Sequence, residues 1–124
     1  MNFLSHSGPL VYVVVLRADG SAAECLLDMS PHKLPLVTLL GGRITINGQY
    51  VPQEVVVVKR QRATVPNQHV LPPPFERDEI KGDIGLVRMN AQSIPESFRL
   101  SEYFALQEPY LVTRRRVYRR GPSR

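Results

Sequence analysis

Proline and glycine are spread so densely through this sequence that they limit every regular element it can form. The 124 residues include 11 prolines and 8 glycines. A proline inside a helix removes a main-chain donor and clashes with the preceding turn, and glycine favours turns, so we expect no long uninterrupted helix. The apolar fraction of 43% is nevertheless that of a folded domain. The sequence therefore predicts one loop-rich α+β domain.

Runs rich in β-branched residues mark the strands of this domain. They cover residues 10–17, 22–29, 43–46, 55–58 and 82–89. Asp19-Gly20 predicts a type I′ hairpin between the first two runs, although the composition of the second would also allow a short helix. Asn47-Gly48 predicts a second hairpin, which returns into the four valines. We expect a mostly antiparallel sheet of about five strands.

The first of two expected short helices covers residues 31–40. Ser30 is a suitable N-cap, and Pro31 stands at the first helical position, where its missing N–H costs nothing. Gly41-Gly42 can end the helix in a left-handed conformation. Pro35 leaves open a helix that begins there instead.

The second expected helix begins at a Ser101 cap, continues over residues 102–106 and is stopped by Pro109. These limits divide the chain into a lead-in over residues 1–9, an α+β domain over residues 10–108 and an arginine-rich tail over residues 109–124.

A long proline-rich loop is predicted between the last two strand runs, because four prolines exclude a regular helix or a central strand. These are Pro66, Pro72, Pro73 and Pro74. Its centre, residues 71–75 (LPPPF), is either a polyproline ligand for an aromatic groove or a brace that drops Phe75 into the core. The composition favours the brace.

The positive charge of the chain is concentrated at its end. The formal net charge is +5, and six arginines fall within the last eleven residues, without an acid among them. They are Arg114, Arg115, Arg116, Arg119, Arg120 and Arg124. Removing these six from the 16 basic residues leaves 10 against 11 acidic residues, a net charge of −1. The basic character therefore belongs to a tail.

Guanidinium groups pair with phosphates in a bidentate way, so this cluster predicts sequence-nonspecific binding to nucleic acid or to an acidic protein surface. Tyr118 could stack on a base between the flanking arginines. Lys59, Arg60 and Arg62 would enlarge this surface if they lay on the same face. The alternatives are a localisation signal, plain solvated charge, or a tail inserted between subunits of an assembly.

Other classes of function are disfavoured. Cys25 is the single cysteine, which excludes an internal disulfide and favours an intracellular, cytoplasmic or nuclear protein. The longest apolar run, residues 10–16, is far shorter than the roughly 20 residues of a membrane span, so no membrane partner is expected. No cofactor and no small-molecule substrate is indicated.

Two constellations could carry chemistry, but neither is predicted to do so. His69 and Asp83 could form an acid–base pair, yet nothing in the sequence brings them together. A metal or nucleophile site at Cys25, Asp28 and His32 is disfavoured because Cys25 and Asp28 would point to opposite faces of a strand, so a buried structural thiol is the better interpretation. We predict that the protein is not an enzyme.

Several phrases in a fixed order carry a resemblance to a known family. They are LLGGRIT (39–45), GQY (48–50), VVVVK (55–59), NQHVLPPPF (67–75), GDIGLVRM (82–89) and SEY (101–103). Over residues 10–107 the chain resembles an uncharacterised small-domain family of unicellular eukaryotes, especially algae, and of large double-stranded DNA viruses. The resemblance implies a setting, such as a virus-encoded protein that is packaged or made during infection, and no activity. The arginine tail lies outside it.

The sequence thus predicts a non-enzymatic interaction module whose arginine-rich tail binds nucleic acid or another polyanionic partner. The alternative is a structural or assembly protein, with a virion as its possible location.

Overall fold

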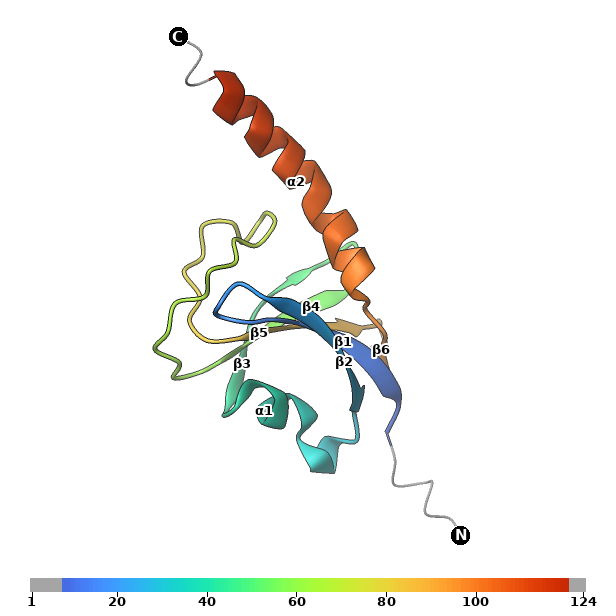
Figure 1. The fold of residues 1–124 in the computed structure, drawn as a ribbon. Coiled ribbons are helices and arrows are strands. Elements are labelled where there is room, and N and C mark those ends of the chain that lie inside the picture. Colours follow the sequence, from blue (N-terminus) through green and yellow to red (C-terminus); the bar gives the residue numbers. More distant parts are fainter. Residues whose placement is uncertain (1–7, 121–124) are drawn as a thin grey trace.

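The strands form one antiparallel sheet, seen edge-on in Figure 1. The computed structural model describes residues 8–120, and the side chains of residues 8–110. Within that range the strands are β1 (Leu10–Leu16), β2 (Ala22–Asp28), β3 (Ile44–Tyr50), β4 (Val55–Arg60), β5 (Ile84–Met89) and β6 (Pro95–Glu96). Their order is β2-β1-β5-β4-β3, and the short β6 pairs with β5. The α+β prediction is confirmed, with six strands instead of about five.

The first predicted hairpin is confirmed, but its turn is of a different type. The strands β1 and β2 pair from Leu10 opposite Asp28 to Leu16 opposite Ala22. Gly20 has a φ of 98°, whereas Asp19 is not among the residues with positive φ. A type I′ turn needs positive φ at both central positions, so the expected turn type is wrong. The amide of Gly20 instead donates to the Arg17 carbonyl, which gives a three-residue loop.

The second predicted hairpin turn is wrong. The strand β3 continues through Asn47-Gly48, where its register against β4 shifts, and the chain reverses at residues 51–54 with Glu54 at a φ of 59°. A Cβ at Gly48 would lie 2.5 Å from the Phe75 ring. Glycine stands here because an aromatic ring from the proline-rich loop approaches the strand closely.

The first predicted helix is interrupted. A 3₁₀ turn covers Pro31–Lys33, Leu34 takes a left-handed conformation with a φ of 47°, and α1 covers Pro35–Leu40. The interpretation in which the helix begins at Pro35 is therefore correct. Ser30 does not cap the 3₁₀ turn with its side chain, because its hydroxyl donates to Asp28. Gly41 ends α1 in the left-handed conformation, as expected.

The second helix is much longer than predicted. The helix α2 covers Leu100–Arg120, 21 residues, with Pro109 inside it. The expectations that the chain has no long helix and that Pro109 stops this one are both wrong. Proline removes one main-chain donor, which is a cost to the helix and not a stop. Ser101 is the second helical residue and not the N-cap, and Glu102 accepts a hydrogen bond from the Arg99 amide at 3.0 Å.

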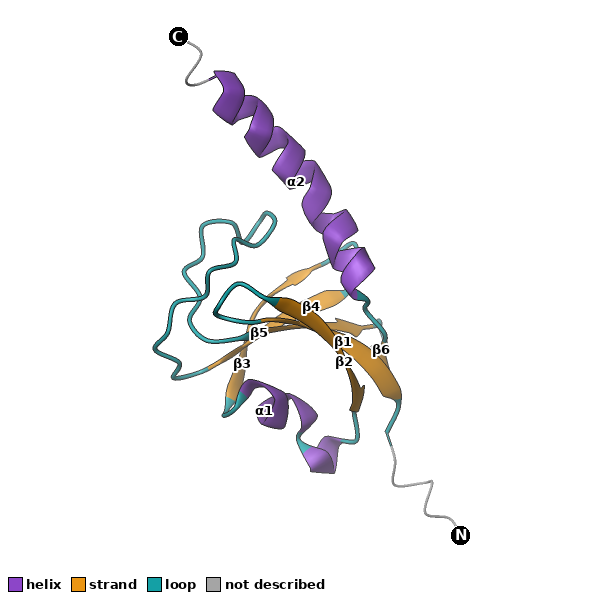
Figure 2. Ribbon diagram, in the orientation of Figure 1, coloured by secondary structure: helices purple, strands orange, loops and turns teal. Residues whose placement is uncertain are grey.

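Two sets of buried side chains lie on opposite faces of the sheet, because successive residues of a strand alternate between faces. One face is covered by the proline-rich loop and the start of α2, and the other by α1, as the ribbon in Figure 2 shows. The first set comprises Val14, Leu16, Tyr50, Val55, Val57, Leu71, Ile80, Ile84, Leu86, Phe98 and Tyr103. The second comprises Val11, Val13, Leu40, Val58 and Val87.

The proline-rich loop connects β4 and β5 without a helix or strand element in this described segment. Leu71 and Pro72 are buried, and the Tyr50 hydroxyl donates to the Pro72 carbonyl at 2.7 Å. The ring of Phe75 packs edge-on against Tyr50, with 5.0 Å between centroids. These contacts favour the brace over the polyproline ligand, since a ligand segment would need the same residues to be accessible.

Candidate nucleic-acid interface

The arginines of the predicted tail lie on a helix and not on an irregular tail. The main chain remains helical through Arg120, so Arg114, Arg115, Arg116, Arg119 and Arg120, together with Tyr118, all belong to α2. Arg124 lies outside the described residues. Figure 1 shows that α2 leaves the sheet after its first turns and points away from it. The helix thus holds the basic segment at a distance from the domain.

A charged contact on the edge strand β2 fixes the direction of α2. Arg99, immediately before the helix, makes two hydrogen bonds to the Glu24 carboxylate, at 3.1 and 2.6 Å. The first amide of the helix, that of Leu100, donates to the same carboxylate at 2.9 Å. The Arg99 hydrogen bond is the main cause that lowers the pKa of Glu24 to about 2. The Arg99 guanidinium also lies over the Tyr12 ring, 3.7 Å from its centroid.

A second contact ties the first turn of α2 to the middle of the sheet. Arg88 of β5 forms an ion pair with Glu102 at 2.9 Å and donates to the carbonyls of Ser97 and Gln53. On the apolar side, Tyr103 is buried in the core, and Leu106 packs against it. Charge pairs and apolar packing therefore set the start of α2, and the helix carries that orientation to the arginines.

The remaining predicted site residues lie elsewhere. Arg60 and Arg62 meet Arg43 around a pocket of about 650 Å³, which also includes Gly41, Gly42 and Gln61. We call this the three-arginine pocket. Lys59 does not line it, because neighbouring residues of a strand point to opposite faces.

The three-arginine pocket and the basic part of α2 do not form one surface. The pocket residues flank the start of β3 and the end of β4, beside α1, whereas the distal part of α2 extends from the other side of the sheet (Figure 1). The condition for an enlarged surface, that Lys59, Arg60 and Arg62 share a face with the arginines of α2, therefore receives no support from their positions. Sequence reasoning missed Arg43, although its place directly after Gly41-Gly42 could have drawn attention to it.

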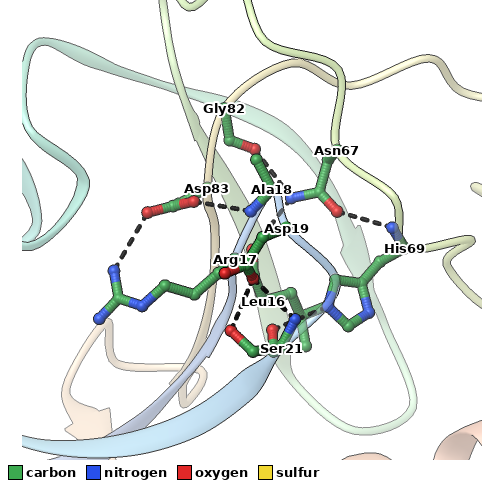
Figure 3. Close-up of polar contacts among 9 residues, drawn as sticks. All are labelled: Leu16, Arg17, Ala18, Asp19, Ser21, Asn67, His69, Gly82 and Asp83. Atoms are coloured by element: carbon green, nitrogen blue, oxygen red, sulfur yellow. Dashed lines mark hydrogen bonds and ion pairs between the residues drawn. The ribbon is translucent and has the colours of Figure 1, made fainter.

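His69 and Asp83 do not contact each other but hold the same hairpin loop. A ring nitrogen of His69 lies 2.9 Å from the Ser21 carbonyl oxygen. Asp83 accepts a hydrogen bond from the Ala18 amide at 2.8 Å and pairs with Arg17 at 3.1 Å. Figure 3 shows both side chains directed at the β1–β2 loop from the proline-rich loop and from the start of β5. Each side chain holds the β1–β2 loop in place, and the two do not form an acid–base pair.

The second disfavoured site, that of Cys25, Asp28 and His32, does not form either, because Asp28 makes local contacts instead. Asp28 pairs with Lys33 at 2.8 Å and accepts hydrogen bonds from Ser30, contacts that hold the pKa of Asp28 below its usual range, with the Lys33 contact as the main cause. Cys25 is half-buried on β2, not fully buried as expected, and His32 is exposed. Within residues 8–110, no group of three potential ligand side chains could hold a metal ion.

Fold and site together define an antiparallel α+β domain that carries a projecting basic helix. None of the helices in the described part of the chain has the length and apolar character needed to cross a membrane. The chain belongs to a family of unknown function, DUF5880, whose model matches residues 14–106. Neither the comparison with curated proteins nor that with solved structures finds a match. The family match ends before the arginines of α2 begin.

Proposed function

We propose that the protein is a non-enzymatic module that binds nucleic acid through the basic part of α2. The observation that supports this most directly is the continuity of the helix from the buried Tyr103 to Arg120. A helix that is anchored at one end presents its other end in a fixed direction. Binding then requires less ordering of the chain than a disordered tail would need.

The spacing of the arginines suits a phosphate backbone. At 100° per residue, helix positions 115, 116, 119 and 120 fall within about 140° of the circumference. Four arginines at such neighbouring helix positions have the charge to replace several counterions condensed on a nucleic acid. The proposed contact is with phosphates, so little dependence on base sequence is expected.

The test compares two double variants with the same change in charge. Arg115→Ala/Arg119→Ala removes two charges from α2, and Arg77→Ala/Lys81→Ala removes two from exposed positions of the domain. Fluorescence anisotropy with single- and double-stranded DNA and RNA, at salt concentrations from about 50 to 200 mM, gives the affinity and its salt dependence. We expect the α2 variant to bind at least about tenfold more weakly, with a salt slope smaller by about two. Equal losses in both variants would contradict a role for α2.

A third variant keeps every charge and weakens the helix. Val112→Gly/Thr113→Gly costs a few tenths of a kcal/mol of helix stability per substitution, just before the first arginine. Circular dichroism measures the loss of helix, and we expect a several-fold loss of affinity with it. An unchanged affinity would show that charge without the helix carries the binding.

The second candidate is an assembly protein in which α2 inserts between copies of the chain. It is favoured by the projection of α2 away from the sheet. A projecting helix is only marginally stable in water, and packing against a second copy of the chain would stabilise it. Size-exclusion chromatography with light scattering tests it, with a concentration-dependent oligomer as the expected result. A monomer over the whole concentration range, together with salt-sensitive DNA binding, would favour the first candidate.

The biological setting is part of the same proposal. We infer an intracellular protein of an alga-like eukaryote or of a large DNA virus, in line with the resemblance described above. Mass spectrometry of purified virus particles would test the viral setting, and enrichment of the protein in the particles is the expected outcome.

A further inference from the structure

We propose that the three-arginine pocket binds a compact oligophosphate group, at a site separate from α2. The shared chemistry is a chain of linked phosphates, which occurs both as inorganic polyphosphate and as the 5′-phosphates of a nucleotide. The inference does not depend on nucleic-acid binding by α2.

The charge of the pocket is not neutralised from within the protein. Arg43, Arg60 and Arg62 line it, the other lining residues are uncharged, and none of the three arginines forms an ion pair with a described residue. Other cations of the domain, such as Arg88 and Arg99, are paired with carboxylates. Three unpaired guanidinium groups around a hollow attract an anion, because the concave surface focuses their field.

The framework of the pocket is built by the main chain. The amide of Gln61 donates to the Arg43 carbonyl at 2.8 Å and closes the open end of the β3–β4 hairpin. Arg60 pairs with Ile44 across the two strands and is half-buried. Arg43 directly precedes β3 and Arg62 follows the end of β4, so both exposed arginines flank Arg60 around the same pocket.

Two glycines make room for the central arginine. A Cβ at Gly42 would lie 3.0 Å from Cδ of Arg60, and a Cβ at Gly41 would lie 3.3 Å from one of its terminal nitrogens. The Arg60 side chain thus lies along a stretch of main chain that carries no side chains. A Cβ at position 42 would require the Arg60 side chain to shift by a few tenths of an ångström.

The size and the lining of the pocket favour an oligophosphate over a nucleic-acid strand. Its volume of about 650 Å³ is that of a small-molecule pocket. No aromatic side chain is among the described residues that line it, so it offers no platform on which a base could stack. Guanidinium groups match phosphate oxygens in a bidentate geometry, and three of them suit two or three linked phosphates.

Isothermal titration calorimetry with the full-length chain tests the proposal. The probes are inorganic tripolyphosphate, ATP and adenosine. We expect saturable binding of tripolyphosphate and no binding of adenosine. An affinity for ATP equal to that for tripolyphosphate supports recognition of the phosphates from either source, and a tighter affinity for ATP supports a nucleotide. If neither tripolyphosphate nor ATP binds, the proposal is wrong.

Variants locate the site. Arg43→Ala, Arg60→Ala and Arg62→Ala should each weaken tripolyphosphate binding about tenfold, whereas Arg77→Ala, with the same change in charge at an exposed position, should not. Circular dichroism and thermal unfolding confirm that each variant is folded.

Two further variants separate position from charge. Gly42→Ala keeps every charge but requires a small shift of Arg60, and we expect a loss of tripolyphosphate affinity that is smaller than in Arg60→Ala. Arg115→Ala/Arg119→Ala should leave this affinity unchanged. A loss in the α2 variant as large as that in Arg60→Ala would overturn the proposal, because it would place the anion on α2.

Discussion

The two faces of the sheet are built from the same strands but are covered to very different extents. One face is covered by the proline-rich loop and α2, and we call it the closed face. It holds the largest buried side chains, among them Phe98 and Tyr103. The other face, which we call the open face, is covered by α1, a helix of six residues. An apolar pocket of about 480 Å³ remains there, and Leu34, Ile46 and Ile94 are exposed around this face.

This difference shows that the alternation of a strand provides two apolar faces but not the segments that cover them. The closed face receives its cover from residues far along the chain, which are fixed by polar contacts such as that between Tyr50 and Pro72. Among the described residues, the open face is covered mainly by the short connection between β2 and β3, with residues 93–95 at the rim of the apolar pocket. The stability of the domain is therefore expected to depend mainly on the closed face.

The largest expected effect compares two residues of β5 that point to opposite faces. Leu86→Ala removes a fully buried side chain from the closed face and should lower the free energy of unfolding by about 3 kcal/mol. Met89→Ala removes a half-buried side chain that already borders the apolar pocket, so little new cavity forms and about 1 kcal/mol is expected. Urea unfolding measures both values, and equal losses would show that the two faces contribute alike.

A smaller effect is expected at the contact that holds the loop on the closed face. Tyr50→Phe removes the hydroxyl that donates to Pro72 and leaves a buried carbonyl without this donor. The free energy of unfolding should fall by about 1 to 2 kcal/mol. If urea unfolding of this variant matches that of the wild type, the loop is held by its apolar contacts alone.

A gain in stability, instead of a loss, is expected when the hydroxyl of a second tyrosine is removed. The Tyr103 hydroxyl is buried and has no hydrogen-bond partner among the described residues, and burial raises its pKa to about 12. Tyr103→Phe removes this unsatisfied group and should raise the free energy of unfolding by about 0.5 to 1 kcal/mol. A loss of stability in this variant would mean that the Tyr103 hydroxyl forms a hydrogen bond in the folded protein.

The smallest effect concerns the solvent-accessible contact between α2 and the edge of the closed face. Because the pKa of Glu24 is lowered from 4.5 to about 2, its stabilising contribution is complete above about pH 4.5. This contribution is lost as the pH falls toward 2. Stability measured at pH 6 and at pH 3 should therefore differ less in Glu24→Gln than in the wild type. An identical pH dependence of the two proteins would show that Glu24 does not anchor the helix.

Much of the sheet could be predicted because its signals are local. The β-branched runs of β1 and β4 and the Gly20 turn are each determined by neighbouring residues, and the structure contains all of them. Asn47-Gly48 misled the prediction, since the same dipeptide serves in a turn or beneath an approaching ring. Only the position of Phe75, 27 residues further along the chain, decides between the two.

The candidate sites show the same division. The arginines of α2 could be found from composition because they are consecutive in the chain. The three-arginine pocket could not, since Arg43 and Arg60 are brought together by strand pairing across a hairpin whose turn was misplaced. Likewise, nothing in the sequence relates His69 to Asp83, and their common contact with the β1–β2 loop follows from loop packing.

By itself, the sequence determined that this protein has a mostly antiparallel sheet and a separate block of positive charge, because runs of β-branched residues and clusters of charge are properties of neighbouring residues. The tertiary structure decided which face is closed, that α2 continues through Pro109 and which arginines share a pocket. The physical reason is that a turn, a proline or a charge carries only a local preference of a few kcal/mol or less, and contacts between distant segments decide whether that preference prevails.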